Sequence, residues 1–459
     1  MTEAQLPAER TPPSFDAVVV GAGPAGSAAA LVLARAGVSV CLVERGPFPG
    51  SKNLFGGVVY PKVLDELVPG WRAEAPIERL VTRRATVMLT GTQSLAVDFR
   101  TTRWGSEPYN GITALRPRFD AWMAARAVEA GAVLVNSTTV SGLVRAGPGG
   151  GARSRGGAGA EGGQVAGVRT DRPDGDIAAR VVIACDGANT FLAREAGCAG
   201  KPDPAHYSLG VKEVLAFAPE EIERRFGLAP GEGADFEVVG GTGGVAGGGF
   251  LYTNHDSVSV GLVLSLPALS SSGRRPEELL ASFKEHPAIA PLVAGGDLVE
   301  YGAHLIPEAG LEMIPKLAAG GFLVAGDAAG MCLAAGIFLE GVNFALASGA
   351  AAGACAAAAI GAGDLSERWL VRDYSRRLEA GFVLADHRKL RRMPHLVLSE
   401  RMQLAYPEIA CNVAEQLFTV TNPAPKSGLV GLTRKELERS GVKLRHAVRD
   451  ALTALRSLG

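Results

Sequence analysis

A short glycine-rich loop near the N-terminus constrains the fold of this chain more than any other feature. Residues 15–20 form a nearly continuous apolar run, which is typical of a strand buried on both faces of a parallel sheet. The loop at residues 21–26 (GAGPAG) follows and opens an alanine-rich helical pattern that stops at Gly37. A second strand pattern, residues 39–43, ends in Glu44. This order predicts a βαβ unit of about 30 residues.

The loop matches the fingerprint of a dinucleotide-binding site. Its first glycine permits the tight turn, its second lets the backbone approach a pyrophosphate, and its third lets helix and strand pack closely. The helix N-terminus offers free N–H groups to the phosphates, and Glu44 can accept hydrogen bonds from the ribose hydroxyls. The sequence therefore predicts dinucleotide contacts from these residues: Gly21, Gly23, Pro24, Ala25, Gly26 and Glu44. This motif alone leaves flavin and nicotinamide dinucleotides open.

Two later segments favour FAD. Apolar residues 322–325 lead into Gly326-Asp327 at a helix start, which resembles the second fingerprint of flavoproteins of the glutathione-reductase fold. In that family the aspartate hydrogen-bonds the ribityl chain. Asp186-Gly187, after the strand pattern 181–184, resembles the further Asp-Gly motif of the aromatic-hydroxylase branch of the same superfamily. Three such motifs in this order predict an FAD site.

The distribution of strand and helix patterns predicts an α/β protein with a Rossmann-like FAD-binding domain of the glutathione-reductase type. Alternating residues at 236–239 and 257–266 flank a glycine tract and indicate an inserted antiparallel sheet. The expected parts are residues 15–207 for the first part of the FAD-binding domain, with a flexible glycine-rich insertion at 147–163; 208–301 for the antiparallel substrate domain; 302–364 for the closing part of the FAD-binding domain; and 365–459 for a C-terminal helical region.

Charge and cysteine content exclude several classes of protein. The 46 Lys and Arg residues nearly balance the 47 Asp and Glu residues, so no overall field recruits nucleic acid. The six cysteines are scattered without a CxxC pair, which predicts reduced thiols, no metal site and a cytoplasmic location. Residues 1–14 lack a signal-peptide pattern. The apolar stretch 322–362 contains Asp327, Glu340 and Asn343, so we expect a buried helix there rather than a membrane span.

Several longer segments resemble FixC proteins, which are relatives of electron-transfer-flavoprotein:ubiquinone oxidoreductase. The segments are residues 44–53, 108–111, 116–120, 247–254 and 303–308, and the resemblance extends from about residue 15 to residue 421. It implies a flavin that accepts electrons from an electron-transfer flavoprotein and passes them to a quinone. Because a flavin carries its own redox chemistry, no catalytic side chain is expected.

The resemblance also implies further site residues. On the FAD side these are Arg45, Asn53, Arg118, Gly336, Gly341 and Asn343; at the quinone they are Gly247, Gly248, Gly249, Phe250, Tyr252, His304 and Phe338, with Leu251 adding to the apolar wall. Backbone donors at 341–343 are expected near the pyrimidine end of the ring, where positive potential favours the reduced flavin. Three alternatives stay open: Arg118 on the surface, His304 as a satisfied core residue, and the glycine tract as a mobile hairpin.

One departure from the ubiquinone oxidoreductase concerns the partners. That enzyme carries a C-terminal iron–sulfur domain with four cysteines, whereas the segment after Asn422 contains none. FixC proteins resemble this chain in that respect and pair with a small ferredoxin-like chain, FixX. The implied partners are the α and β subunits of an electron-transfer flavoprotein, a FixX-like ferredoxin, a quinone and the inner face of the cytoplasmic membrane. The basic, amphipathic pattern at 434–457 suits such docking, or packing against the body.

Other functions share the same flavin domain. A prenyl reductase of the geranylgeranyl type or an aromatic hydroxylase reacts with an alkene or with oxygen instead of a quinone. A non-catalytic flavin-binding subunit would only scaffold an electron-transfer complex. The sequence leaves open which quinone is used and whether electrons also reach a ferredoxin.

Overall fold

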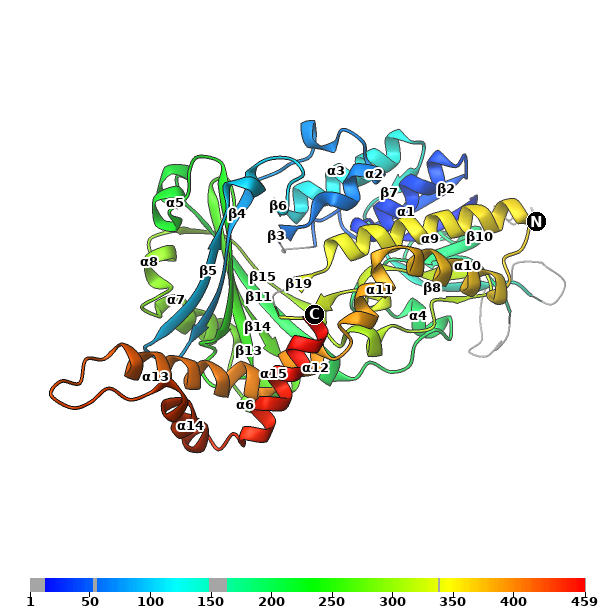
Figure 1. Cartoon of the computed structure of the whole chain (residues 1–459). Coiled ribbons are helices and arrows are strands. Elements are labelled where there is room, and N and C mark those ends of the chain that lie inside the picture. The colour runs from blue at the N-terminus through cyan, green and yellow to red at the C-terminus, as the bar shows by residue number, and fades with distance from the viewer. Residues whose placement is uncertain (1–12, 53–55, 148–162, 337–338, 459) are drawn as a thin grey trace, which may run out of the picture.

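Two sheets lie side by side and divide the molecule into two layers (Figure 1). The computed structural model describes residues 13–52, 56–147, 163–336 and 339–458. The predicted site residues Asn53 and Phe338, and nearly all of the glycine-rich segment 147–163, lie outside these ranges. The other predicted site residues lie within them.

The first sheet is mainly parallel and contains the predicted βαβ unit. Its central strand β1 (Ser14–Val20) pairs in parallel with β10 (Ile177–Ala184) and with β2 (Val40–Val43). Two further parallel strands extend it, β7 (Val133–Val135) beside β2 and β17 (Phe322–Val324) beside β10. All four residues of β2 and the last four of β1 are buried, as expected for central strands of a parallel sheet. The Rossmann-like prediction is confirmed.

Three helices pack on this sheet and on one another. They are α1 (Pro24–Arg35), α3 (Arg116–Glu129) and α9 (Val342–Ala362). Of the helices in the described part of the chain, only α9 is long and apolar enough to span a membrane, and 56% of that stretch is buried inside the molecule. Because α9 packs against α1 and α10 (Glu367–Ala380), its apolar surface is part of the core, as expected for a buried helix.

The second sheet is larger and mixed. Its strands, in spatial order, are β15 (Asp297–Pro307), β11 (Tyr207–Ala216), β14 (Ser257–Ser265), β13 (Gly247–Thr253), β12 (Glu232–Gly240), β4 (Arg79–Leu89), β6 (Ile112–Leu115) and β3 (Gly56–Val59), with β5 (Ser94–Arg100) beside β4. All neighbours are antiparallel except β12 and β4. The strands expected at 236–239 and 257–266 are present as β12 and β14.

The expected boundaries of the second domain differ from the structure. Strands from residues 56–115 join this sheet, although we expected them in the FAD-binding part, and β15 extends it to Pro307. Backbone hydrogen bonds between strands do not depend on sequence distance, so local patterns could not assign these strands to a sheet.

Helices cover one face of the second sheet and leave the other face toward the first layer. The covering helices include α5 (Pro219–Phe226) and α7 (Pro276–Glu285). Phe226 and Phe283 from these helices share a core with Phe236 of β12. Since side chains alternate along a strand, Asp235 and Glu237 of β12 lie on the opposite face.

The chain ends in a group of helices, as predicted from about residue 365. After α10 these are α11 (Phe382–Lys389), α12 (Met393–Val397), α13 (Tyr406–Phe418), α14 (Leu429–Arg439) and α15 (Leu444–Leu458). In Figure 1, α13 to α15 lie along the lower edge of the second sheet.

Candidate functional site

The glycine loop between β1 and α1 has the geometry of a phosphate-binding turn. Gly21 has φ of 96°, and a Cβ there would lie 2.4 Å from the carbonyl oxygen of Cys185. A Cβ at Gly26 would lie 1.8 Å from the Gly21 oxygen. At Gly23, the N-cap of α1, the nearest atom is Nη2 of Arg116 at 3.8 Å. The first and third glycines are therefore required by packing, whereas the second leaves an open cradle.

Helix α9 runs parallel to α1 and in direct backbone contact with it. A Cβ at Gly349 would lie 2.0 Å from the oxygen of Ala25, and one at Gly353 would lie 2.6 Å from the oxygen of Ala29. Ala25 is in the first turn of α1, whereas α9 begins at Val342, about two turns before its contact with Ala25. The N-termini of α1 and α9, which both carry positive potential, therefore point toward the same region, and α9 extends about two turns further into it.

Glu44 is held beside the glycine loop. Its carboxylate accepts hydrogen bonds from the backbone N–H of Ala22 at 3.0 Å and of Gly46 at 2.7 Å. The residue is buried at the carboxyl end of β2, next to β1. The carboxylate is thus fixed in place next to the loop, and its contact with a ribose stays a prediction.

Asp186 follows β10 at the same edge of the sheet. Both of its carboxylate oxygens are buried. Burial raises the pKa of Asp186, while Thr190 and backbone N–H groups of the next turn oppose that rise. Gly187 has φ of 80° and open space around its Cβ position. A buried carboxylate with several lone pairs can accept a further hydrogen bond from a ligand that brings hydroxyl groups.

Asp327 lies at the centre of a charged group that joins the two layers. Gly326 packs against Ala25 of α1, because a Cβ added to Gly326 would lie 2.8 Å from the Cβ of Ala25. Burial raises the pKa of Asp327, and the charges of Arg116 and His304 lower it. Burial lowers the pKa of His304. The charge of Asp327 raises this pKa, and the charge of Arg45 lowers it. Strand β15 thus brings His304 to the FAD motifs.

The structure brings Arg116, rather than the predicted Arg118, to this group. Arg116 binds Asp120 through two hydrogen bonds of 2.7 and 2.8 Å and points toward the cradle at Gly23. The side chain of Arg118 is 64% exposed and pairs with Glu78 at 3.2 Å. Two positions along a helix differ by about 200° in direction, so the two arginines face opposite sides. The signal available in the sequence was an arginine four residues before an aspartate on a predicted helix, a spacing at which the two side chains can pair.

The N-terminus of α9 carries the remaining predicted flavin contacts. Gly341 is its N-cap, and Asn343 is buried with Nδ2 donating to Glu340. The Oδ1 atom of Asn343 is buried without a partner in the described residues. Gly336 has φ of 80° in the preceding turn. Unused polar groups at a helix N-terminus fit the polar edge of a flavin ring.

The glycine tract is a central strand rather than a mobile hairpin. A Cβ at Gly247 would lie 2.3 Å from the oxygen of Val263, and one at Gly248 would lie 2.4 Å from that of Val238. Tight strand packing therefore accounts for both glycines. Gly249 faces the helical side, where its Cβ position is 2.6 Å from the Phe283 ring, and Leu251 lies in the same core. Neither residue is open to the flavin side, contrary to our expectation.

Gly248, Phe250 and Tyr252 share the face of β13 that is turned toward the first layer. The rings of Phe250 and Tyr252 stack with centroids 4.9 Å apart and planes within 15°. This pair is a flat, largely buried aromatic surface, suited to an aromatic or quinone ring.

A cavity of about 290 Å³ is lined in part by Asp327. Besides Asp327 and Gly330, it is lined by Arg194, Lys201 and Tyr207. No local pattern of residues predicts this cavity, because its walls come from separate segments of the chain.

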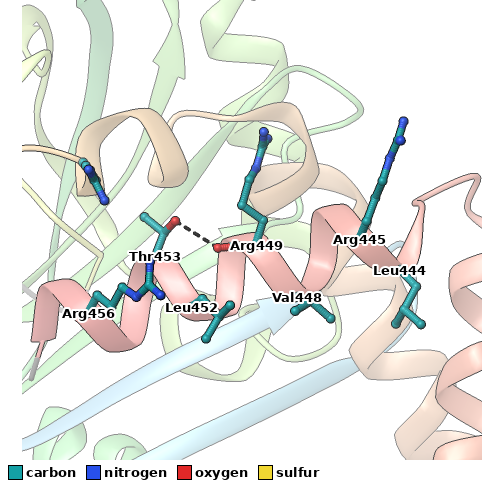
Figure 2. A pocket seen from close by; sticks show the side chains of 8 residues that line it. Leu444, Arg445, Val448, Arg449, Leu452, Thr453 and Arg456 are labelled. Carbon is teal, nitrogen blue, oxygen red and sulfur yellow. Dashed lines mark hydrogen bonds between the residues drawn. The ribbon is translucent and has the colours of Figure 1, made fainter.

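The last helix, α15, presents a two-sided surface. Figure 2 shows Val448 and Leu452 on one side of the helix, and Arg445 and Arg449 on the other. These residues line a groove of about 700 Å³. Asp450 anchors the helix to the body by accepting hydrogen bonds from Arg401 at 3.0 Å and Tyr406 at 2.7 Å.

Comparisons with known proteins identify the family of this chain. Residues 16–106 match the family described as FAD dependent oxidoreductase, and residues 207–306 match the family described as ETF-QO, ubiquinone-binding. Protein FixC of Escherichia coli K12 is 40% identical over 94% of this chain and 95% of its own length. The probable electron transfer flavoprotein-quinone oxidoreductase YdiS of the same strain is 39% identical over 94% and 98%.

Solved structures show the same fold. A geranylgeranyl bacteriochlorophyll reductase-like protein from Thermoplasma acidophilum superposes with a TM-score of 0.69 at 18% identity, over 96% of this chain and all of the other. The halogenase CndH, a myxobacterial variant of FAD-dependent halogenases, gives 0.60 at 18% identity and 97% of both chains. The open cradle at Gly23 and the buried carboxylate of Asp186 fit the same cofactor, FAD. The chain belongs to the FixC family of FAD-dependent oxidoreductases, which includes homologues of electron-transfer-flavoprotein:quinone oxidoreductases.

Proposed function

We propose that this chain accepts electrons from an electron-transfer flavoprotein and passes them to a quinone. The observation that supports this most directly is the position of the segment matching the ubiquinone-binding family. Its strands turn one face toward the FAD motifs, where His304 of β15 lies within electrostatic reach of Asp327. A quinone bound on that face would lie next to the flavin.

The protein residues would then bind and orient the two redox partners. FAD supplies reversible electron storage when bound. The open cradle at Gly23 and the N-terminus of α1 would hold its pyrophosphate, with Glu44 at the ribose. The N-terminus of α9 would place positive potential near the ring, which stabilises its reduced, anionic form. The stacked rings of Phe250 and Tyr252 would form one wall of an apolar quinone pocket.

The proposed protein partners are both subunits of an electron-transfer flavoprotein and a FixX-like ferredoxin. The six cysteines of the chain are free thiols on separate elements, buried or half-buried. A cluster between flavin and quinone would therefore come from another chain.

A membrane surface is the proposed place of action, because a quinone is dissolved in lipid. The exposed apolar residues Leu444, Val448, Leu452 and Leu455 recur along α15 between arginines. Further exposed apolar residues, Phe418, Val420, Leu429 and Val430, lie around the connection from α13 to α14. Apolar side chains flanked by basic ones are suited to a bilayer with anionic headgroups. We place the protein at the inner face of the cytoplasmic membrane on these grounds.

An anaerobic electron-transfer experiment tests the proposal. The FAD-loaded protein is mixed with a reduced electron-transfer flavoprotein, and the flavin absorbance is followed before and after addition of a short-chain quinone. We expect bleaching by the flavoprotein and recovery with the quinone. Reduction by NADPH with turnover of a prenyl alkene or an aromatic substrate would instead identify a reductase or hydroxylase. Bleached flavin that does not recover with quinone would leave a scaffold subunit.

A further inference from the structure

Two carboxyl groups share one arginine on the face of the second sheet that is turned toward the flavin motifs. Arg84 of β4 binds Asp235 through Nε at 2.9 Å and Glu237 through Nη2 at 2.8 Å. The side chain of Asp235 is 2% exposed and that of Glu237 is 11% exposed. Asp235 Oδ1 is buried without a hydrogen-bond partner in the described part of the chain. Neither the FAD motifs nor the quinone contacts proposed above use this pair.

Strand register places the pair beside the aromatic wall. Asp235 lies opposite Tyr252, and Glu237 lies opposite Phe250. Both carboxyl groups belong to the segment that matches the ubiquinone-binding family. Glu340, two residues before the start of α9, is close enough for its charge to act on Tyr60, and its own charge is stabilised by Arg84. The pair therefore lies between the expected quinone wall and the expected flavin edge.

The charges of this group favour the binding of one proton. Two carboxylates beside a single guanidinium carry a net negative charge, which is unfavourable away from water. The groups facing the pair are Arg84, Tyr60, Tyr252 and Glu340. Burial raises the pKa of Glu237, and the neighbouring Asp235 raises it further against the effect of Arg84. Burial also raises the pKa of Asp235. Two buried carboxyl groups that share one guanidinium are therefore suited to hold one proton between them.

We propose that this carboxyl pair, through Glu237, is the proton donor for quinone reduction, an inference that rests on the proposed function. Reduced anionic flavin gives up two electrons and one proton, and the carboxylic acid gives the second proton to a quinone oxygen. The products are oxidised flavin, quinol and a carboxylate held by Arg84. Solvent returns the proton to the pair before the next turnover.

The first test observes the proton itself in the oxidised, FAD-loaded protein without turnover. Infrared spectra of protein with and without ¹³C-labelled glutamate isolate the carboxyl bands. A protonated glutamate band that persists at neutral pH and is absent from Glu237→Gln supports the assignment. A wild-type protein without such a band refutes it, whatever the behaviour of the variant.

The second test follows reoxidation of the reduced flavin by a soluble quinone across a pH series. In the wild type the rate should fall as the pH rises above neutrality. In Glu237→Gln it should be about 100-fold lower and lack that inflection, since general acid catalysis contributes this much or more. The matched control is Glu213→Gln, which removes a carboxylate paired with Lys284 on the helical face of the same sheet and should behave as wild type.

The two proposals fail in different ways. If wild-type flavin is not reoxidised by quinone, the proposed function is wrong. If wild type is reoxidised and Glu237→Gln has the same rate and pH profile, only the proton-donor role is wrong, and Arg84 and the two carboxylates form a structural ion triad. If Glu237→Gln does not fold, the spectrum of Glu308→Gln decides, because Glu308 is the other buried glutamate with a pKa near neutrality: a protonated glutamate band that persists in this variant supports the assignment, and its absence refutes it.

Discussion

Gly349 of α9 lies directly against the carbonyl oxygen of Ala25 in α1, so close that a Cβ at Gly349 would come within 2.0 Å of it. The contact joins the helix that opens at the glycine loop to the helix whose N-terminus faces the expected ring. Because both sides of this contact are backbone, no side chain can move to relieve a clash.

Gly349→Ala should therefore lower the free energy of unfolding by about 2 kcal/mol, within the range for overpacked cores. It should also lower the FAD content, since α9 has to shift. The control is Gly361→Ala in the same helix, where nothing lies within 4 Å of the Cβ position. There the better helix propensity of alanine should add up to about 1 kcal/mol. Equal stabilities of the two variants in urea unfolding would contradict the packing argument.

Gly23→Val should give folded protein without FAD. Gly23 has φ of −75°, which valine adopts, and only Arg116 Nη2 approaches its Cβ position, at 3.8 Å. The new side chain would occupy the cradle where the pyrophosphate is expected. Flavin absorbance and circular dichroism measure the two effects separately. Normal flavin content would show that the cradle lies elsewhere, and Gly91→Val, in open space between β4 and β5, provides the control.

Arg116→Lys and Arg118→Lys should differ in FAD affinity although both keep their charge. Lysine cannot reproduce the two-pronged contact of Arg116 with Asp120, so its charge would leave the position beside Gly23. We expect the FAD dissociation constant to rise about tenfold, equivalent to about 1.4 kcal/mol, for Arg116→Lys and to stay unchanged for Arg118→Lys. Titration of both apoproteins with FAD measures this. The reverse order would restore Arg118 to the site.

Stability should fall between mildly acidic and neutral pH because of Glu308. Burial raises the pKa of Glu308 from 4.5 to about 7, while its hydrogen bond with Ser208 opposes that rise. Between pH 4.5 and about 7, Glu308 ionises in the unfolded chain and stays protonated in the folded chain. The free energy of unfolding therefore falls by on the order of 3 kcal/mol over this range and does not fall further at higher pH. Glu308→Gln should remove this loss. Urea unfolding of both proteins across the pH range measures it, and parallel curves would contradict the assignment.

Val448→Gln combined with Leu452→Gln should weaken binding to vesicles that contain anionic lipid. The two side chains lie on the exposed side of α15, so their loss should leave the fold intact. Burying two apolar side chains in a bilayer contributes about 3 kcal/mol, so the partition coefficient should fall about 100-fold in a sedimentation assay. Thr453→Ala on the same helix is the control. Unchanged binding of the double variant would contradict a membrane contact through α15 and leave the exposed apolar residues around the α13–α14 connection as the alternative.

The sequence by itself determined the features that depend on local backbone chemistry. The glycine loop, the acid at the end of β2 and the Gly326-Asp327 turn are each specified within a few residues, because only certain residues fit a tight turn or a close helix contact. These motifs predicted FAD and the Rossmann-like sheet, and the comparisons confirmed both.

Only the tertiary structure decided which side chains meet. The choice between Arg116 and Arg118 depends on the direction of each around α3, and the choice between Gly248 and Gly249 depends on which face of β13 is turned to the flavin motifs. The group of Arg84, Asp235 and Glu237 combines strands about 150 residues apart along the chain. Strand pairing and burial bring these three side chains together, and neither can be read from a local pattern of residues.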